Sequence, residues 1–161
     1  MKMDQDKSLR EHLRELLDWE DAHVNFDTAV EGLPRSKRGF IPEGLPYSPW
    51  QLVEHIRRTQ RDILDFCRDP GYVQPPMDQY WPSSAKPPND AAWEASIEAF
   101  RGDREVLKQL ASDVSISLFD RIPHGDGQTY LRELLLVADH NAYHVAQLVA
   151  VRRTLGAWKA S

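Results

Sequence analysis

The amino-acid sequence predicts an all-α protein, a four-helix bundle with long connections, in a single domain that spans residues 1–161. Apolar residues recur at helical spacing in four segments of about 20 to 27 residues each. No segment shows the alternation of apolar and polar residues that is typical of a half-buried strand. Two connections are long, so the bundle need not follow a simple up-and-down topology.

The first helix is expected to begin near Ser8 and to end at Gly32-Leu33-Pro34. Its charged residues fill the face opposite an apolar line that consists of Leu9, Leu13, Leu16, Leu17, Val24 and Val30. Residues 35–47 follow as a loop, because their glycines and prolines restrict any long regular element.

The second helix has the clearest start in the chain. Ser48 is a good N-cap, Pro49 suits the first helical position, and Gln51 can complete a capping box. The helix is expected to stop at Asp69-Pro70-Gly71. Residues 70–89 then contain six of the eleven prolines together with several aromatic residues, which favours a packed irregular segment of the kind that often borders a site.

The third and last helices follow in the second half of the chain. Asn89 or Asp90 can cap a third helix that reaches about Ser115. The last helix is expected from Thr129 to Leu155, where Gly156 provides the C-terminal cap. Because apolar residues cover more than one of its faces, we expect this helix to be the most buried of the four.

Composition excludes several classes of function. The net charge of -5 comes with mixed basic and acidic residues and no basic face, so nucleic acid is not an expected partner. Cys67 is the only cysteine, which excludes an intramolecular disulfide and suits a reducing compartment. Residues 1–10 are polar, and no stretch has the length of a membrane span. We therefore expect a soluble, cytoplasmic protein with no membrane contact.

Two histidines in the last helix suggest a metal site. His140 and His144 are four residues apart, so their side chains project from one helix face and can share one ion. The alternative is that both rings simply hydrogen-bond to neighbours. Burial favours the metal, because two adjacent imidazoles would otherwise have to be desolvated and satisfied separately among Val137, Val145 and Leu148.

A third ligand has to come from another helix, and His55 in the second helix is our choice among three candidates. His23 is expected on the inward line of the first helix, as a fourth ligand or a neighbour that hydrogen-bonds to a ligand, although a structural role is favoured. His124 lies in the turn before the last helix, and we expect it to be exposed, like His12.

Other polar residues near these histidines have weaker functional signals. Gln147 shares the face of His140 and His144 and can orient a bound water or a substrate, although a hydrogen bond between helices is the simpler role. Glu54 and Asp139 adjoin proposed ligands in sequence, but adjacent helical residues point in different directions, so neither is assigned as a general base. Cys67 is expected to be a small buried residue and not a nucleophile.

The pattern resembles the DinB-like family of helical bundles. The segments that carry the resemblance are Trp50-Gln51-Leu52-Val53-Glu54-His55, the run from Asp139 to Gln147 with its H-x-x-x-H pair, and the ending from Arg152 to Trp158. The resemblance implies a four-helix bundle, often a homodimer, with a nickel or zinc ion on His55, His140 and His144. It also implies activities such as those of relatives that are transferases and isomerases dependent on small thiols, bacillithiol and mycothiol among them.

Two kinds of function are compatible with such a site. The first is a metal-dependent hydrolase or a small-thiol-dependent transferase that acts on an unidentified small molecule, because three neutral histidines leave a divalent ion with an open position. The second is a non-catalytic bundle, stabilised by its metal, that serves as a protein-interaction or stress-response module. A fourth protein ligand such as His23 would favour the second.

Overall fold

A computed structural model describes residues 2–158, with side chains from Asp4 onward. Its helices are α1 (Lys2–Leu16), α2 (Phe26–Val30), α3 (Pro49–Arg68), α4 (Asp90–Ser112) and α5 (Tyr130–Thr154), with 3-10 turns η1 (Arg35–Lys37) and η2 (Met77–Tyr80). The only β pairing in this described part is an isolated bridge between Arg121 and Thr129. The predicted all-α class is therefore confirmed. No helix within these residues is both long and apolar enough to cross a membrane.

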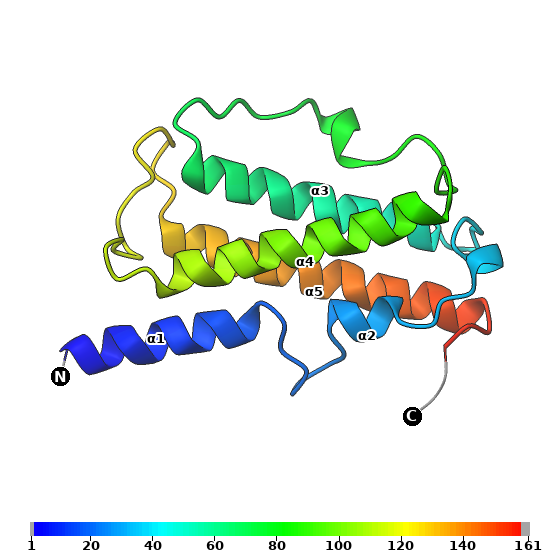
Figure 1. The fold of residues 1–161 in the computed structure, drawn as a ribbon, viewed down its shortest axis with the longest axis horizontal. Coiled ribbons are helices and arrows are strands. Elements are labelled where there is room, and N and C mark those ends of the chain that lie inside the picture. The colour runs from blue at the N-terminus through cyan, green and yellow to red at the C-terminus, as the bar shows by residue number, and fades with distance from the viewer. Residues whose placement is uncertain (1, 159–161) are drawn as a thin grey trace.

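The helices form a four-helix bundle in which α1 and α2 together occupy one position (Figure 1). Helices α3 and α4 run in the same direction, whereas α1, α2 and α5 run in the opposite one (Figure 1). Helix α3 packs against both α4 and α5, and α1 packs against α4 and α5. The parallel pair requires the chain to return along the bundle after α3, which is the role of residues 69–89.

Local sequence signals account for most helix boundaries. Ser48 accepts a hydrogen bond from the Gln51 N–H, and the Gln51 side chain accepts one from the Ser48 N–H, so the capping box is present. Asn89 caps α4 and Thr129 caps α5 through their side-chain oxygens. Gly156, at φ +62°, ends α5 with the two backbone hydrogen bonds of a Schellman motif.

The expectation of one continuous first helix was wrong. Helix α1 ends at Leu16, and Asn25 starts α2 by accepting a hydrogen bond from the Thr28 N–H. Asn25 also donates to the Asp18 carbonyl, which holds the intervening turn in place. The break lets α1 and α2 bury apolar residues in two different cores, which one straight helix would not align.

Two apolar cores fill the two ends of the bundle. The first includes α2 and the N-terminal half of α3, and its largest members are Trp50, Trp93, Phe26 and Phe100. The second includes α1 and the C-terminal half of α3, with Leu64, Leu107, Leu118, Ile122 and Leu134. Between them, the fully buried Gln60 donates to the Phe100 carbonyl and accepts from the Asn141 side chain. This polar link joins α3, α4 and α5 at mid-length.

Helix α5 is not the most buried helix, contrary to expectation. Ten of its 25 residues are buried, against 11 of 20 in α3, so α3 is the central helix of the bundle. Leu135, Leu136 and Tyr143 are exposed on the outer side of α5. Apolar residues on several faces of a helix do not by themselves make it the most buried one, because the packing around α3 decides which faces are covered.

A pair of arginines on α4 holds the short helix α2 in place. Arg101 Nε and Arg104 Nη1 each donate to the Asp27 carboxylate at 2.7 Å. Burial alone would raise the pKa of Asp27, but the hydrogen bonds and charges of the two arginines outweigh it, so that its pKa falls below the ordinary 3.8. The Asp27 contribution to stability is therefore present above pH 3.8 and is lost as the pH falls through the lower folded-state pKa.

We predict that Asp27→Asn lowers the free energy of unfolding by about 1 kcal/mol at neutral pH, a value reduced for the partial exposure of the group. The difference from the wild type should shrink below pH 3.8, where the wild-type carboxylate itself becomes protonated. Urea unfolding of both proteins at neutral pH and at about pH 3 measures this difference in the free energy of unfolding. Asp21→Asn, at an exposed position, is the control and should change little. A pH-independent difference would contradict the electrostatic explanation.

Candidate metal centre

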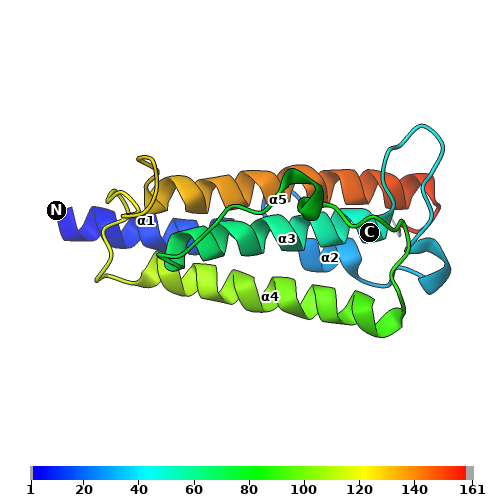
Figure 2. The same cartoon turned by 90° about the horizontal axis from the view of Figure 1, so that it is seen from above.

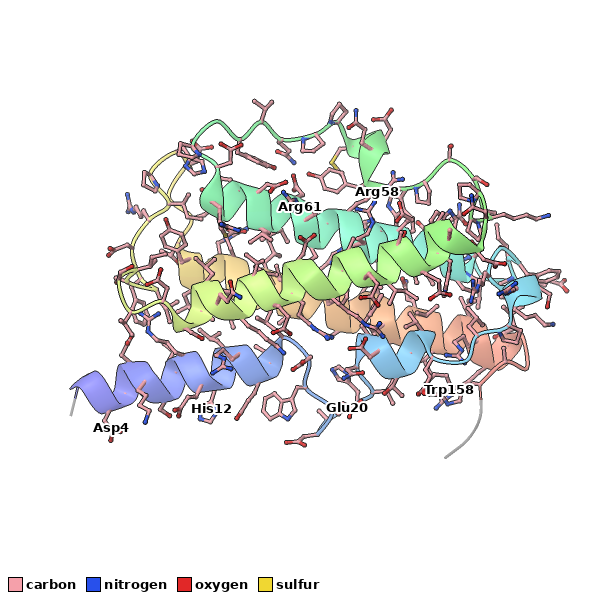
Figure 3. All side chains as sticks on the ribbon, in the orientation of Figure 1. Asp4, His12, Glu20, Arg58, Arg61 and Trp158 are labelled. Carbon is pink, nitrogen blue, oxygen red and sulfur yellow. The ribbon has the colours of Figure 1, made fainter. Side chains whose placement is uncertain are left out.

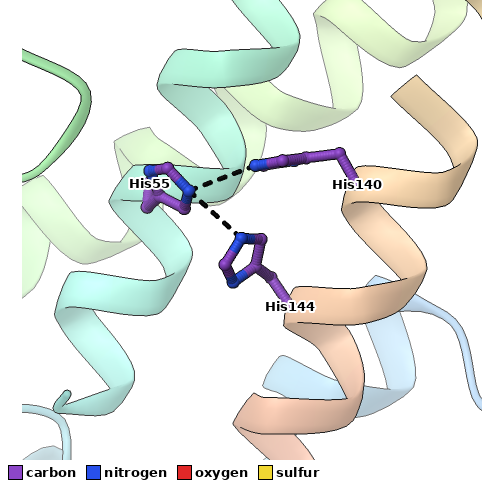
Figure 4. A group of neighbouring side chains, drawn as sticks. All are labelled: His55, His140 and His144. Carbon is purple, nitrogen blue, oxygen red and sulfur yellow. Dashed lines mark hydrogen bonds between the residues drawn. The ribbon is translucent and has the colours of Figure 1, made fainter. Parts of the chain in front are cut away.

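Packing of α3 against α5 brings three histidines together. The Nε2 atom of His55 lies 3.2 Å from that of His144 and 3.1 Å from that of His140 (Figure 4). Their ligand atoms all lie within 4.8 Å of one another, in the one group of this kind found among the described residues. The i, i+4 spacing on α5 supplies two of the rings, and helix packing supplies the third.

In His55 and His144, hydrogen bonds to the other ring nitrogen determine which atom carries the proton. His55 Nδ1 lies 3.0 Å from the Tyr80 carbonyl oxygen, which can only accept, so this nitrogen is the donor. His144 Nδ1 lies 2.8 Å from Oε1 of Gln147 and likewise donates. A neutral imidazole that donates from Nδ1 has an unprotonated Nε2.

Two unprotonated Nε2 atoms therefore face each other at 3.2 Å, His55 against His144. Burial lowers the pKa of His55 to about 4, despite its hydrogen bond to Tyr80, so a proton does not occupy this space at neutral pH. Burial likewise lowers the pKa of His140 to about 4, with the neighbouring histidines adding to the effect. Two lone pairs at this distance repel unless a cation lies between them.

The donor set fits a divalent metal ion. Nitrogens bound to one ion at about 2.0 to 2.1 Å lie about 2.8 to 3.4 Å apart for bond angles from about 90° to 109°. Two of the three spacings, those from His55 to His140 and to His144, fall inside this range, and all the ligand atoms lie within 4.8 Å of one another. Neutral imidazoles held by acceptors on their second nitrogen are also the usual arrangement of metal-binding histidines. The group therefore has the donor chemistry of a three-histidine metal site, with His55 at ligand spacing from both histidines of α5.

Aromatic rings cover the His55 side of the group. The Trp81 ring stacks on His55 at 3.8 Å between centroids and 8° between planes, and Tyr47 stacks on the other face of Trp81 at 4.0 Å. On the α5 side, the exposed Tyr143 contacts His144 edge to face at 4.9 Å. These rings restrict the motion of His55 and limit its contact with water.

The carboxylate nearest in sequence to His55 has a structural role. Glu54 is buried and accepts hydrogen bonds from Arg57, Arg58 and Ser96. Burial by itself would raise the Glu54 pKa, but these donors lower it to about 2. A carboxylate so fully engaged is a poor proton acceptor. Asp139 is exposed on α5 and does not belong to the histidine group, so neither carboxylate acts as a general base here.

The other sequence candidates lie elsewhere. The expectation that His23 faces inward was wrong: it lies in the turn between α1 and α2, is exposed, and contacts the Val24 carbonyl. His124 was expected to be exposed but is half-buried, because its Nε2 contacts the Phe66 carbonyl at 2.7 Å. His12 is exposed beside Glu15.

Cys67 is free and buried, as expected. Burial raises the pKa of its thiol to about 12, with a smaller effect from the Glu133 charge, so it is not a reactive nucleophile at neutral pH. Its surroundings are the second apolar core, away from the histidine group.

Sequence reasoning missed the residues that surround His55. Tyr80 acts through its backbone carbonyl, which no side-chain pattern can reveal. Nothing in the sequence distinguishes Arg58 from the other charged residues on the exposed face of its helix. The signal that was present is the concentration of aromatic residues and prolines in residues 70–89. It predicted a packed segment near a site but not which atoms meet the histidine.

Comparison with models of protein families assigns the chain to a family. The model of the DinB superfamily matches residues 18–148, which is most of the chain and includes all three histidines. The chain belongs to the DinB superfamily. No curated protein and no solved structure matches it. In this DinB-superfamily chain the match begins after α1 and covers α2, α3 and α4 and most of α5, so it contains both helices that supply the histidine group.

We predict that Gln147→Leu weakens zinc binding about tenfold, because the His144 ring loses the acceptor that fixes its proton on Nδ1. Gln147→Glu is the matched control: it keeps an acceptor oxygen at the same position and should retain wild-type affinity or bind more tightly. Competition with a chromophoric chelator measures both. Equal affinities for Gln147→Leu and the wild type would show that this hydrogen bond does not support the site.

Proposed function

We propose that the chain is a metal-dependent DinB-superfamily protein that holds one divalent ion, zinc or nickel, on His55, His140 and His144. The observation that carries the proposal is the pair of unprotonated Nε2 atoms of His55 and His144, which face each other at 3.2 Å in a partly buried site. An ion bound there removes the repulsion between the two lone pairs and links α3 to α5.

The ion would supply positive charge and an open coordination position, at which a bound thiol loses its proton or a carbonyl is polarised. The residues of the chain would supply the rest. Tyr80 and Gln147 keep His55 and His144 neutral and aimed at one point, and Trp81 limits the access of water from the His55 side. The exposed Tyr143 lies beside the site, where a small-molecule substrate can meet it.

Among the reactions open to such a site, we favour transfer of a small thiol over hydrolysis. Thiol activation needs no separate base, because coordination alone removes the thiol proton. Hydrolysis is usually assisted by a carboxylate base, and Glu54 is held in ion pairs while Asp139 points to solvent. A metal-dependent hydrolase is the alternative that the assays below compare.

The position of His23 favours an enzyme over a non-catalytic bundle. A fourth protein ligand would close the coordination shell, as in structural sites. His23 is exposed and bonded to its neighbour's carbonyl, and the group of potential ligands among the described residues contains three side chains. Three protein ligands and a free position are the pattern of catalytic zinc sites.

The first test is metal content. We predict about one zinc or nickel ion per purified chain, and its loss in the double variant His140→Ala/His144→Ala, because one ligand cannot retain the ion. Elemental analysis by plasma mass spectrometry measures the content. His12→Ala, which removes an exposed histidine, should keep the wild-type content. Full metal retention in the double variant would contradict the proposal.

A second readout is stability. Chelation should lower the melting temperature of the wild type, because the ion binds only the folded arrangement of α3 and α5. The double variant should melt at the same temperature with and without chelator. An unchanged wild-type melting curve would show that no ion ties these helices together.

The preference for a thiol can be tested with a matched pair of ligands. A small thiol should raise the melting temperature of the metal-loaded wild type, whereas the alcohol with the same carbon skeleton should not. Neither should stabilise the double variant. If thiol and alcohol have equal effects, and the loaded protein cleaves activated esters or amides, the hydrolase alternative replaces the transferase.

A further inference from the structure

Residues 72–81, which we call the strap, lie within the long return from α3 to α4. Figure 2 shows this segment running lengthwise over the side of the bundle formed by α3 and α5, with η2 near its C-terminal end. The strap is close to the candidate metal centre because it ends with Tyr80 and Trp81, whose carbonyl and ring, respectively, contact His55. The position of the strap therefore determines the surroundings of that ring.

Tyrosine hydroxyls fasten the strap to the middle of α3. Tyr72 and Tyr80 each donate a hydrogen bond of 2.7 Å to the Asp62 carboxylate, one to each oxygen. Burial, together with the Asp62 acceptor, raises the pKa of both phenols, so they remain protonated donors. These contacts hold both ends of the strap but do not reach the histidine group.

Arg58 fastens the end of the strap that meets His55. Its Nη1 donates to the Gln79 carbonyl at 2.9 Å and to the Trp81 carbonyl at 3.3 Å, the two residues on either side of Tyr80. Its Nε donates to Glu54 Oε2 at 2.9 Å, which fixes the guanidinium on α3. Figure 3 shows Arg58 on α3 beside η2.

We propose that Arg58 is a positioning residue for the metal centre: by holding the carbonyls of Gln79 and Trp81, it aims the Tyr80 carbonyl and the Trp81 ring at His55. The inference rests on the proposed function, since the aim of His55 matters to function only if this ring is a ligand. The physical requirement is strict. The Tyr80 carbonyl must stay within hydrogen-bond distance of Nδ1 for Nε2 to remain unprotonated and directed at His140 and His144.

The guanidinium geometry suits this role better than an ammonium would. Arg58 engages a carboxylate through Nε and two carbonyls through Nη1 at the same time, in one fixed plane. A lysine at this position would keep the charge beside Glu54 but would offer one flexible donor group. Arg58→Lys therefore removes the positioning while it preserves the ion pair with the buried carboxylate.

Arg61 provides a matched control one turn along the same helix. It also lies beneath the strap (Figure 3), but its hydrogen bonds go to Asp65 and Asp103 and to no strap carbonyl. Arg61→Lys changes the same chemical group on the same helix. It should therefore reproduce any general effect of replacing a guanidinium and none of the effect on His55.

The first measurement uses the metal-free protein. In the wild type, nitrogen NMR of the imidazoles should show His55 with its proton on Nδ1, protected from exchange by the Tyr80 carbonyl. Arg58→Lys should give a mixture of tautomers or a rapidly exchanging proton, whereas Arg61→Lys should match the wild type. A His55 signal unchanged in folded Arg58→Lys would overturn the inference. This outcome does not depend on metal binding.

The second measurement is zinc affinity by chelator competition. Arg58→Lys should bind zinc about tenfold or more weakly than the wild type, and Arg61→Lys should bind equally well. A purely structural role would lower the melting temperature of the metal-free protein without this loss of affinity. Equal affinities for Arg58→Lys and the wild type would overturn the inference alone, whereas a wild type that binds no zinc or nickel would overturn the proposed function. Should Arg58→Lys fail to fold, Arg58→Gln, which also removes the guanidinium contacts with the Gln79 and Trp81 carbonyls, must shift the His55 tautomer, or the inference fails.

Discussion

The buried amide of Gln60 determines how α3, α4 and α5 align, and the candidate site depends on this alignment. Its nitrogen donates to the Phe100 carbonyl of α4, and its oxygen accepts from Asn141 of α5. A sliding of α5 along α3 would break the bond to Asn141, and a sliding of α4 would break the bond to Phe100; either would leave a fully buried amide group unsatisfied, which costs far more than an exchange of one apolar contact for another. Asn141 is the neighbour of His140, so the polar link that sets the register also sets the height of the histidine pair opposite His55.

The topology explains why the strap covers one side of the candidate site. Helices α3 and α4 are parallel, so the chain must travel back along a helix of about 30 Å before α4 can begin. A connection of this length crosses the outer side of α3, and its carbonyls and aromatic rings become available to the residues below. The strap uses them: the same ten residues satisfy Arg58, Asp62 and His55. The return of the chain thus provides the hydrogen bond that orients one of the three histidines.

Charge and burial divide the polar residues near the site into two groups. Glu54 forms ion pairs with both Arg57 and Arg58 beside the histidines and accepts a further hydrogen bond from Ser96, and this set joins α3 to α4 and the strap. The three imidazoles are different, because burial lowers their pKa values and the unprotonated Nε2 atoms of His55 and His144 face each other at 3.2 Å. The hydrogen-bonding groups of the first set satisfy one another, whereas the nitrogens of the second set would be satisfied by a cation. This difference, more than the number of histidines, separates a metal site from a buried polar cluster.

The sequence by itself determined the three long helices α3, α4 and α5, their caps and the three histidines that the structure brings together. Capping at Ser48, Asn89 and Gly156 and the spacing of His140 and His144 are local properties, which a few neighbouring residues specify. The break after Leu16, the exposure of His23 and the parallel course of α3 and α4 were decided by the tertiary structure, because they depend on which faces two separate cores can bury. The meeting of His55 with the pair on α5 and the orientation of its ring were decided there too. Both result from contacts between residues distant in the chain, and the second from a backbone carbonyl, an atom that every residue carries and that no sequence pattern distinguishes.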